Sequence, residues 1–192
     1  MLVQVTDNIW KINHDSNMYL IKASNEIIII DSCKEMHKQE VKKEIMEICN
    51  PRDVRKVLFT HLHYDHIGNF ELFENAKFYA SKDEISFFRK DGLGAVLKKD
   101  IAERFGKNLY PLEDINDELR TIGFTVFAAP GHTIGSVLLL YGDILFSGDT
   151  YFGSTIYGRT DLPSSVPEKM PQTLKMLKQI QHKILCGGHD YL

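Results

Sequence analysis

The segment His61-Leu62-His63-Tyr64-Asp65-His66 gathers three imidazoles and one carboxylate directly after the apolar run 57–59. Imidazole nitrogens and carboxylate oxygens are common protein ligands of zinc and iron. On an extended segment His61, His63 and Asp65 share one face, and His66 joins them only if the chain turns there. A strand that runs into a turn and a helix start would aim two sets of ligands at one point. This arrangement suits two adjacent metal ions better than one.

The alternative, polar residues on a solvated loop, is disfavoured because three further segments supply ligands of the same kinds. In each, a short apolar strand candidate ends in a glycine-bearing turn that holds one histidine or aspartate. The three are His132 after the run 125–127, Asp149 after 144–146, and His189 after 184–186.

The order of these motifs, HxHxDH followed by a lone His, an Asp after a strand and a late His, resembles the metallo-β-lactamase superfamily. The resemblance covers Asp31 to His189. It implies an α/β fold, a four-layer αβ/βα sandwich of two mixed sheets with outer helices and a site at one edge between the sheets. It also implies a ligand set, in which His61, His63 and His132 bind one metal, Asp65, His66 and His189 bind the other, and Asp149 bridges them.

Two divalent ions about 3.5–4 Å apart can share a water and lower its pKa toward ~7. Zinc is the default metal for these ligands, and iron or manganese are alternatives. Asp65 would also orient the nucleophile.

Asp31 ends the strand 26–30, and two roles are open for it. It either fixes the tautomer of a ligand histidine or is a turn residue at the strand end.

Asp149 distinguishes branches of the superfamily, because zinc β-lactamases lack a bridging aspartate at the matching position. The sequence is more similar to the glyoxalase II group, and the segment Gly158-Arg159-Thr160-Asp161 is also similar to persulfide dioxygenases. Arg159 either pairs with Asp161 to shape a loop or binds an anionic group of the substrate. Glyoxalase II carries a C-terminal helical domain that helps to bind glutathione, and this sequence ends three residues after His189, so glutathione specificity stays open.

The resemblance therefore predicts a metal-dependent hydrolase that cleaves a thioester such as an acylglutathione. A persulfide dioxygenase with one iron on His61, His132 and Asp149 is the main alternative. A lactonase or phosphodiesterase would use the same ligands. A non-catalytic metal-binding module is disfavoured because none of the family's ligands is missing.

The 192 residues fit one domain, 1–192, and the net charge of −3 argues against a nucleic-acid partner. No apolar run reaches the roughly 18 residues of a membrane span, and no signal peptide is visible. Three cysteines without metal-motif spacing do not predict a disulfide framework, which favours the cytoplasm. We expect a small-molecule substrate and a monomer or homodimer.

The expected elements alternate between sheet and helix. The segment 81–107 is helical in composition, and it either closes over the site as a lid or packs on the sheet. Helices are also expected around 41–48, ended by Asn50-Pro51, and at 167–181. Strands are expected at 2–6, 9–12, 17–22, 26–30, 54–59, 119–127, 137–141 and 144–146.

Overall fold

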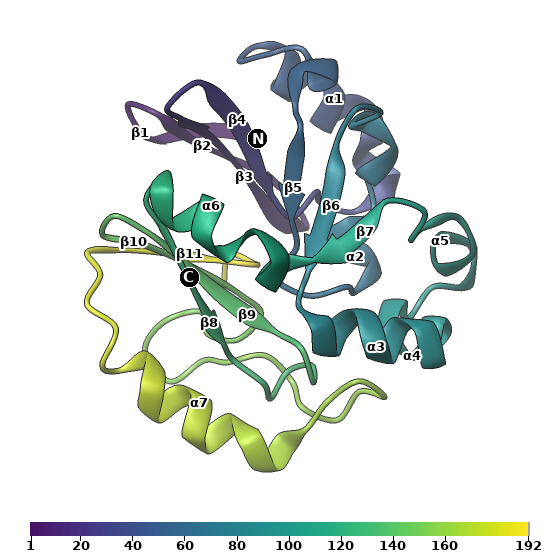
Figure 1. The fold of residues 1–192 in the computed structure, drawn as a ribbon, viewed down its shortest axis with the longest axis vertical. Helices are drawn as coiled ribbons and strands as arrows, with labels where there is room; N and C mark the ends of the chain where they lie inside the picture. Colours follow the sequence, from purple (N-terminus) through teal and green to yellow (C-terminus); the bar gives the residue numbers. More distant parts are fainter. Residues whose placement is uncertain (192) are drawn as a thin grey trace.

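The computed structural model describes residues 1–191, which form two mixed sheets (Figure 1). The first sheet has seven strands in sequential order, antiparallel up to β4 and parallel from β4 onward. They are β1 (Leu2–Thr6), β2 (Ile9–His14), β3 (Ser16–Ala23), β4 (Glu26–Ile30), β5 (Lys56–Leu58), β6 (Lys77–Ala80) and β7 (Leu109–Pro111).

The second sheet has four strands in the order β11-β10-β9-β8, antiparallel except for the parallel pair β10 and β11. Its strands are β8 (Phe124–Ala128), β9 (Val137–Tyr141), β10 (Ile144–Gly148) and β11 (Ile184–Gly187).

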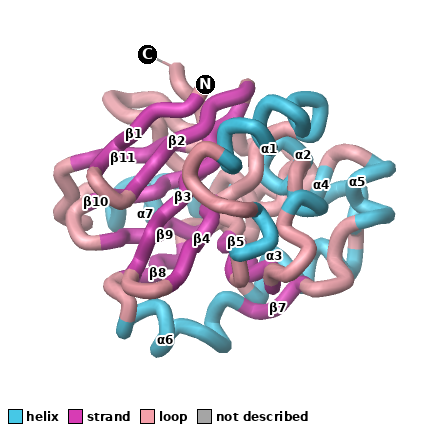
Figure 2. Tube along the Cα trace, turned by 90° about the horizontal axis from the view of Figure 1, so that it is seen from above, coloured by secondary structure: helices cyan, strands magenta, loops and turns pink. Residues whose placement is uncertain are grey.

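Helices lie outside both sheets, and α1 to α5 gather on one side of the strands (Figure 2). None of the helices within 1–191 is long and apolar enough to cross a membrane. Short 3-10 helices lie at 35–37, 51–53, 70–72, 112–115 and 167–169. The α-helices are α1 (Lys38–Met46), α2 (Tyr64–Ile67), α3 (Lys82–Lys90), α4 (Gly92–Val96), α5 (Lys99–Arg104), α6 (Asn116–Thr121) and α7 (Met170–Leu177).

Apolar side chains fill the three spaces between four layers, as in the predicted αβ/βα sandwich. Strand β4 shows how the layers form: Ile28 and Ile30 lie in the cluster between the sheets, whereas Ile29 packs with Val41 and Ile45 of α1. Both faces of β4 are buried, which explains its unbroken apolar run. A third cluster joins the second sheet to α7.

One expected element is wrong, and two strands were not predicted. The segment expected as one strand at 119–127 begins inside α6, and β8 starts only at Phe124. Acidic residues in the first turn of α6 favour the helix, and Gly123, at φ +100°, separates it from β8. Strands β6 and β7, which have four and three residues, were not predicted.

The segment 81–107 forms α3, α4 and α5 and packs onto the first sheet, the second of its two expected roles. Ile85, Ala95, Val96 and Ile101 are all buried in the cluster beneath that sheet.

Candidate metal centre

The structure brings all seven predicted ligands together at the edge where strand ends of the two sheets meet. The HxHxDH segment runs from the end of β5 into α2, and this helix supplies the turn that His66 requires. His132 follows β8, Asp149 follows β10 and His189 follows β11. Rigid strands thus deliver every ligand from a loop that they anchor.

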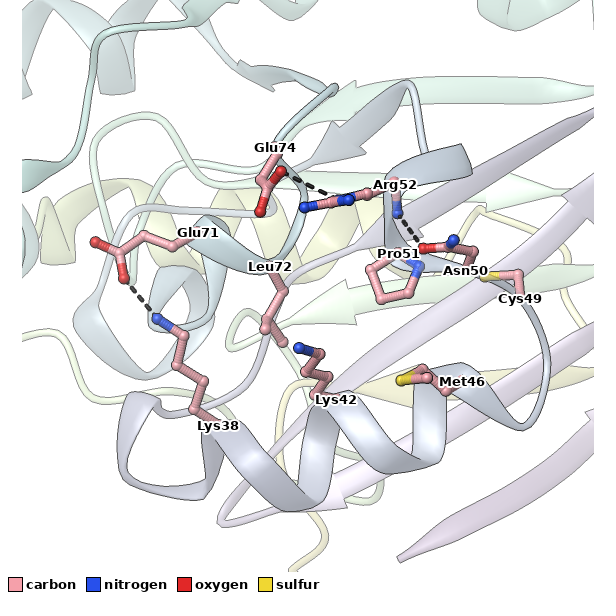
Figure 3. Close-up of a pocket in the computed structure, with 10 residues that line it drawn as sticks. All are labelled: Lys38, Lys42, Met46, Cys49, Asn50, Pro51, Arg52, Glu71, Leu72 and Glu74. Carbon is pink, nitrogen blue, oxygen red and sulfur yellow. Dashed lines mark hydrogen bonds and ion pairs between the residues drawn. The ribbon is translucent and has the colours of Figure 1, made fainter.

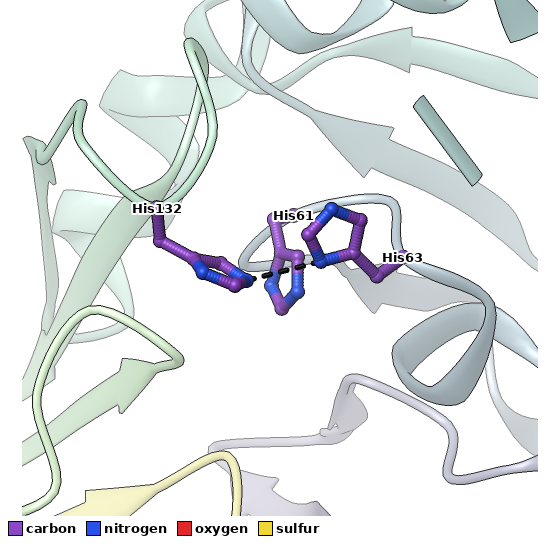
Figure 4. Close-up of side chains that lie close together, drawn as sticks. All are labelled: His61, His63 and His132. Atoms are coloured by element: carbon purple, nitrogen blue, oxygen red, sulfur yellow. Dashed lines mark hydrogen bonds between the residues drawn. The ribbon is translucent and has the colours of Figure 1, made fainter. Parts of the chain in front are cut away.

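His61, His63 and His132 form a tight group of imidazoles (Figure 4). Nε2 of His132 lies 3.0 Å from Nδ1 of His63, and the ring centroids of His61 and His132 are 4.8 Å apart. One nitrogen of each ring lies within 4.8 Å of the others, so three nitrogen ligands can reach one ion.

Asp65, His66 and His189 form a second group beside the first. Nε2 of His189 lies 3.4 Å from Oδ2 of Asp65. Asp149 lies between the groups, with Oδ1 3.2 Å from Nε2 of His66 and Oδ2 3.6 Å from Nε2 of His132. Oδ2 of Asp149 also lies 3.4 Å from Nε2 of His189, so this carboxylate lies between the two groups and is placed to be shared by them.

The ring nitrogen that points away from the centre is held by the protein in all five histidines. This arrangement fixes the tautomer and the orientation of each ring. The contacts are Nδ1 of His61 with Oγ1 of Thr60 (3.1 Å), Nε2 of His63 with Oγ of Ser164 (3.2 Å), Nδ1 of His66 with Oδ2 of Asp31 (3.0 Å), Nδ1 of His132 with the carbonyl of Arg159 (2.8 Å) and Nδ1 of His189 with the carbonyl of Asp15 (2.6 Å).

Several polar atoms that face the centre form no hydrogen bond within the described chain, although two of them, Nε2 of His66 and Oδ1 of Asp149, lie 3.2 Å apart. Nε2 of His61, Nε2 of His66 and Oδ1 of Asp149 are buried and make no hydrogen bond among residues 1–191. Buried polar atoms are rarely left unsatisfied in folded proteins. Their donor types and convergence fit two divalent cations, one on each group, with Asp149 shared.

The two groups differ in proton affinity. Burial and the charge of neighbouring imidazoles lower the pKa of His63 to about 3 and hold the pKa of His61 well below its usual value. Burial also acts to lower the pKa of His189, but hydrogen bonds to Asp149 and Asp65 outweigh it and raise the pKa to about 9. The first group is therefore neutral at pH 7, whereas the second holds protons that a cation must displace.

The position of Asp31 agrees with the first of its two expected roles. Its backbone has φ +56°, a left-handed conformation that aspartate tolerates better than most residues. This conformation turns the carboxylate back over the strand end, where it accepts hydrogen bonds from the backbone N–H of Thr60 (2.9 Å) and from Oγ1 of Thr60 (2.8 Å). The same carboxylate contacts His66, so it orients a ligand ring.

Gly188 allows β11 to approach the centre. A Cβ atom at this position would collide with Oδ1 of Asp149 and with Cε1 of His66. The glycine directly before His189 is therefore explained by the close approach of the backbone to the centre.

A cavity of about 500 Å³ opens over the centre. Arg159 lines it, but its guanidinium is exposed and pairs with Asp161 at 2.7 and 2.8 Å. This pairing agrees with the loop-shaping role expected for Arg159, and its carbonyl additionally holds His132. The remaining wall is mostly aromatic and aliphatic, formed by Tyr64, Leu97, Phe152, Ile156, Tyr157, Leu162 and Tyr191.

A larger cavity of about 640 Å³ lies elsewhere, beside α1 (Figure 3). Its charged side chains are largely neutralised by pairing, with Lys38 bound to Glu71 at 2.6 Å and Arg52 to Glu74 at 3.2 Å. Size alone therefore does not locate the functional site in this protein, and the convergence of ligands does.

The chain matches the profile of the metallo-beta-lactamase superfamily over residues 13–189. A "probable metallo-hydrolase" of Methanocaldococcus jannaschii is 27% identical over 175 residues, which cover 88% of this chain and 83% of the relative. The hydroxyacylglutathione hydrolase of Salmonella typhi is 30% identical over 138 residues, 70% of this chain and 47% of the relative. The chain thus spans about half the length of that enzyme.

Solved structures share the fold. A B3 metallo-beta-lactamase with an active-site glutamic acid superposes with a TM-score of 0.72 at 23% identity, covering 99% of this chain and 79% of that chain. TTHA1623, solved in a di-iron-bound form, gives a TM-score of 0.70 at 25% identity over 93% of this chain and 90% of that chain. The profile match and the shared two-sheet architecture lead to one conclusion: the chain belongs to the metallo-beta-lactamase superfamily.

Proposed function

We propose that this protein is a binuclear metal-dependent hydrolase and that its substrate is a thioester. The observation that carries the proposal is the pair of complete ligand groups with Asp149 between them. Distant similarity to a hydroxyacylglutathione hydrolase supports a thioester carbonyl as the target.

His61, His63 and His132 would hold one ion, and Asp65, His66 and His189 the other. When bound, the ions supply Lewis acidity and lower the pKa of a water molecule to about 7, so that hydroxide is available at neutral pH. The chain's own contribution is positioning: the five held imidazoles fix the orientation of the ligand rings, and Asp65 would orient the attacking water.

The lining of the cavity supports a small neutral acyl group. Tyr64, Phe152, Tyr157 and Tyr191 offer apolar faces, and the cation at the rim, Arg159, is already paired with Asp161. An anionic substrate group would have to compete with Asp161 for the guanidinium. We therefore propose that recognition centres on the acyl thioester and less on a charged thiol.

The test uses one acyl group on two thiols. Hydrolysis of S-lactoylglutathione and of S-lactoyl-N-acetylcysteamine is followed by the loss of ultraviolet absorbance of the thioester, with zinc-loaded and iron-loaded protein. We expect chelator-sensitive hydrolysis of both substrates, lost in D149A and retained in D143N, whose side chain lies on the exposed turn between β9 and β10.

Hydrolysis of the glutathione thioester alone would contradict the proposed recognition and keep the reaction class. Hydrolysis of neither substrate with either metal would contradict thioester cleavage. Oxygen uptake with glutathione persulfide by iron-loaded protein would then support the dioxygenase alternative, and lactone opening would support a lactonase.

A further inference from the structure

Glu84 is a buried carboxylate that the metal ligands do not explain. It lies in the first turn of α3, and only 1% of its surface is exposed. Burial raises the pKa of Glu84 above its usual value, although hydrogen bonds from its neighbours act in the opposite direction. No lysine, arginine or histidine within residues 1–191 forms an ion pair with it. Burying a carboxylate costs free energy unless it is paired or hydrogen-bonded, so this side chain depends on the hydrogen bonds that it accepts.

The contacts of Glu84 reach two separate loops. Oε1 accepts a hydrogen bond from the backbone N–H of Leu62 at 3.0 Å. Oε2 accepts hydrogen bonds from Oγ1 of Thr133 at 2.8 Å and from the backbone N–H of Gly135 at 3.0 Å. Leu62 stands between two of the histidines of the first group, and Thr133 directly follows the third. One carboxylate therefore ties together the two loops that carry this group.

Neighbouring residues make the connection rigid. Oγ of Ser81 accepts a hydrogen bond from the backbone N–H of Glu84 at 3.1 Å and donates one to the carbonyl of Gly135 at 2.6 Å. A side chain at Gly135 would collide with the backbone nitrogen of Glu84 and with Ser81. The start of α3 thus fits closely against the loop after His132, with no room for a shift.

We propose that Glu84 is a positioning residue of the metal centre, which sets the separation of the two loops and thereby the metal affinity of the His61, His63 and His132 group. Among residues 1–191 the Glu84 side chain forms no hydrogen bond or ion pair with the residues beside His66 or His189, so we expect the second group to be affected less. This inference rests on metal binding by the proposed centre and is independent of which substrate is cleaved.

The test separates the two groups by removing one ligand at a time. In H189A the first group remains intact, and in H61A the second does. E84Q keeps the shape of the side chain but replaces one acceptor oxygen with an NH2 donor. This donor would face an N–H or hydroxyl donor of a ligand loop, so a hydrogen bond is lost there. Zinc affinity is measured by competition with a chromophoric chelator, and the cobalt d–d absorption spectrum reports ligand geometry.

We expect E84Q to lower zinc affinity about 10–100-fold in the H189A background and to change it less than about threefold in the H61A background. The cobalt spectrum should change only in H189A. E113Q is the matched control, because Glu113 accepts hydrogen bonds from the backbone N–H of Lys82 in the same turn of α3 but, within residues 1–191, forms no hydrogen bond with either ligand loop. It should leave both affinities unchanged.

Unchanged zinc affinity and cobalt spectrum of folded E84Q in H189A would overturn the proposal. If E84Q does not fold, T133V, which removes one donor to Glu84, carries the test, and an unchanged affinity in the H189A background would overturn the proposal equally. Because these readouts need no substrate, a failure of thioester hydrolysis would leave this inference standing.

Discussion

Oδ2 of Asp31 lies 3.0 Å from Nδ1 of His66, and both side chains are buried. The same carboxylate accepts two hydrogen bonds from Thr60, the residue before the HxHxDH segment. One side chain at the end of β4 therefore fixes both the start of the ligand loop and the tautomer of its last histidine.

Replacing this carboxylate should weaken the second metal most, because Asp31 contacts His66 directly and reaches His61 only through Thr60. In D31N the side chain keeps its size and asparagine tolerates the left-handed backbone, but the charge that holds His66 is lost. We expect zinc affinity of the second group to fall about 10–100-fold. Chelator competition measures it, with D143N as the control because that carboxylate pairs with Lys183 far from the centre. Full binding of two zinc ions by D31N at wild-type affinity would contradict this role.

Metal binding to the two groups should differ in proton release. Below its pKa of about 9, His189 is protonated and cannot bind a cation, so binding at pH 7 must displace a proton. The low pKa values of His61 and His63 leave nothing to displace in the first group. Titration calorimetry in buffers of different ionisation enthalpy should detect more proton release in H61A, which keeps the second group, than in H189A, where ionisation of a metal-bound water is the remaining source. Equal release in both variants would contradict the assignment.

The metal-free protein should lose stability as pH rises from about 6.5 to 9. The raised pKa of His189 means that the folded state binds its proton more tightly than the unfolded state, so this stabilisation is complete below 6.5 and is lost through pH 9. The shift corresponds to at most about 3 kcal/mol. The lowered pKa values of His61 and His63 act oppositely and remove stability as pH falls below 6.5. Urea unfolding should therefore show a maximum near 6.5, and H189Q should flatten its alkaline side.

Gly188 should not tolerate a side chain. The methyl group of G188A would collide with Asp149 and His66, so we expect a destabilisation of about 1–3 kcal/mol together with loss of the second metal. G92A is the control, because the neighbours of its new methyl group lie at ordinary contact distances of 3.6–3.9 Å. Metal content and thermal unfolding of both variants check the expectation, and a G188A protein that holds two metals would refute it.

The seven candidate ligands could be identified from the sequence because each lies after an apolar strand and carries an imidazole or a carboxylate. The groups that hold them were harder to foresee. The carbonyls of Asp15 and Arg159 are backbone atoms that leave no mark in the sequence, and Ser164 is distant from His63 along the chain. The spacing of Ser81 and Glu84 does signal a helix start, but nothing in it indicates that the carboxylate turns inward.

The same contrast between local patterns and long-range contacts applies to the secondary structure. Long apolar runs such as 26–30 predicted strands correctly, because burial on both faces determines them. The short strands β6 and β7 depend on parallel pairing with distant neighbours, which no local pattern encodes. At 119–127 a local apolar pattern favoured strand, whereas the buried Leu119 belongs to a helix that packs against β8.

The ligands come from both sheets, and His63 and His132 are separated by 69 residues. Neither half of the chain can assemble the centre alone, so the ions have no site until the two sheets have docked. Cations that bind only the finished fold leave the rate of folding unchanged and slow its reversal. Bound metals would therefore slow unfolding and lengthen the lifetime of the native state.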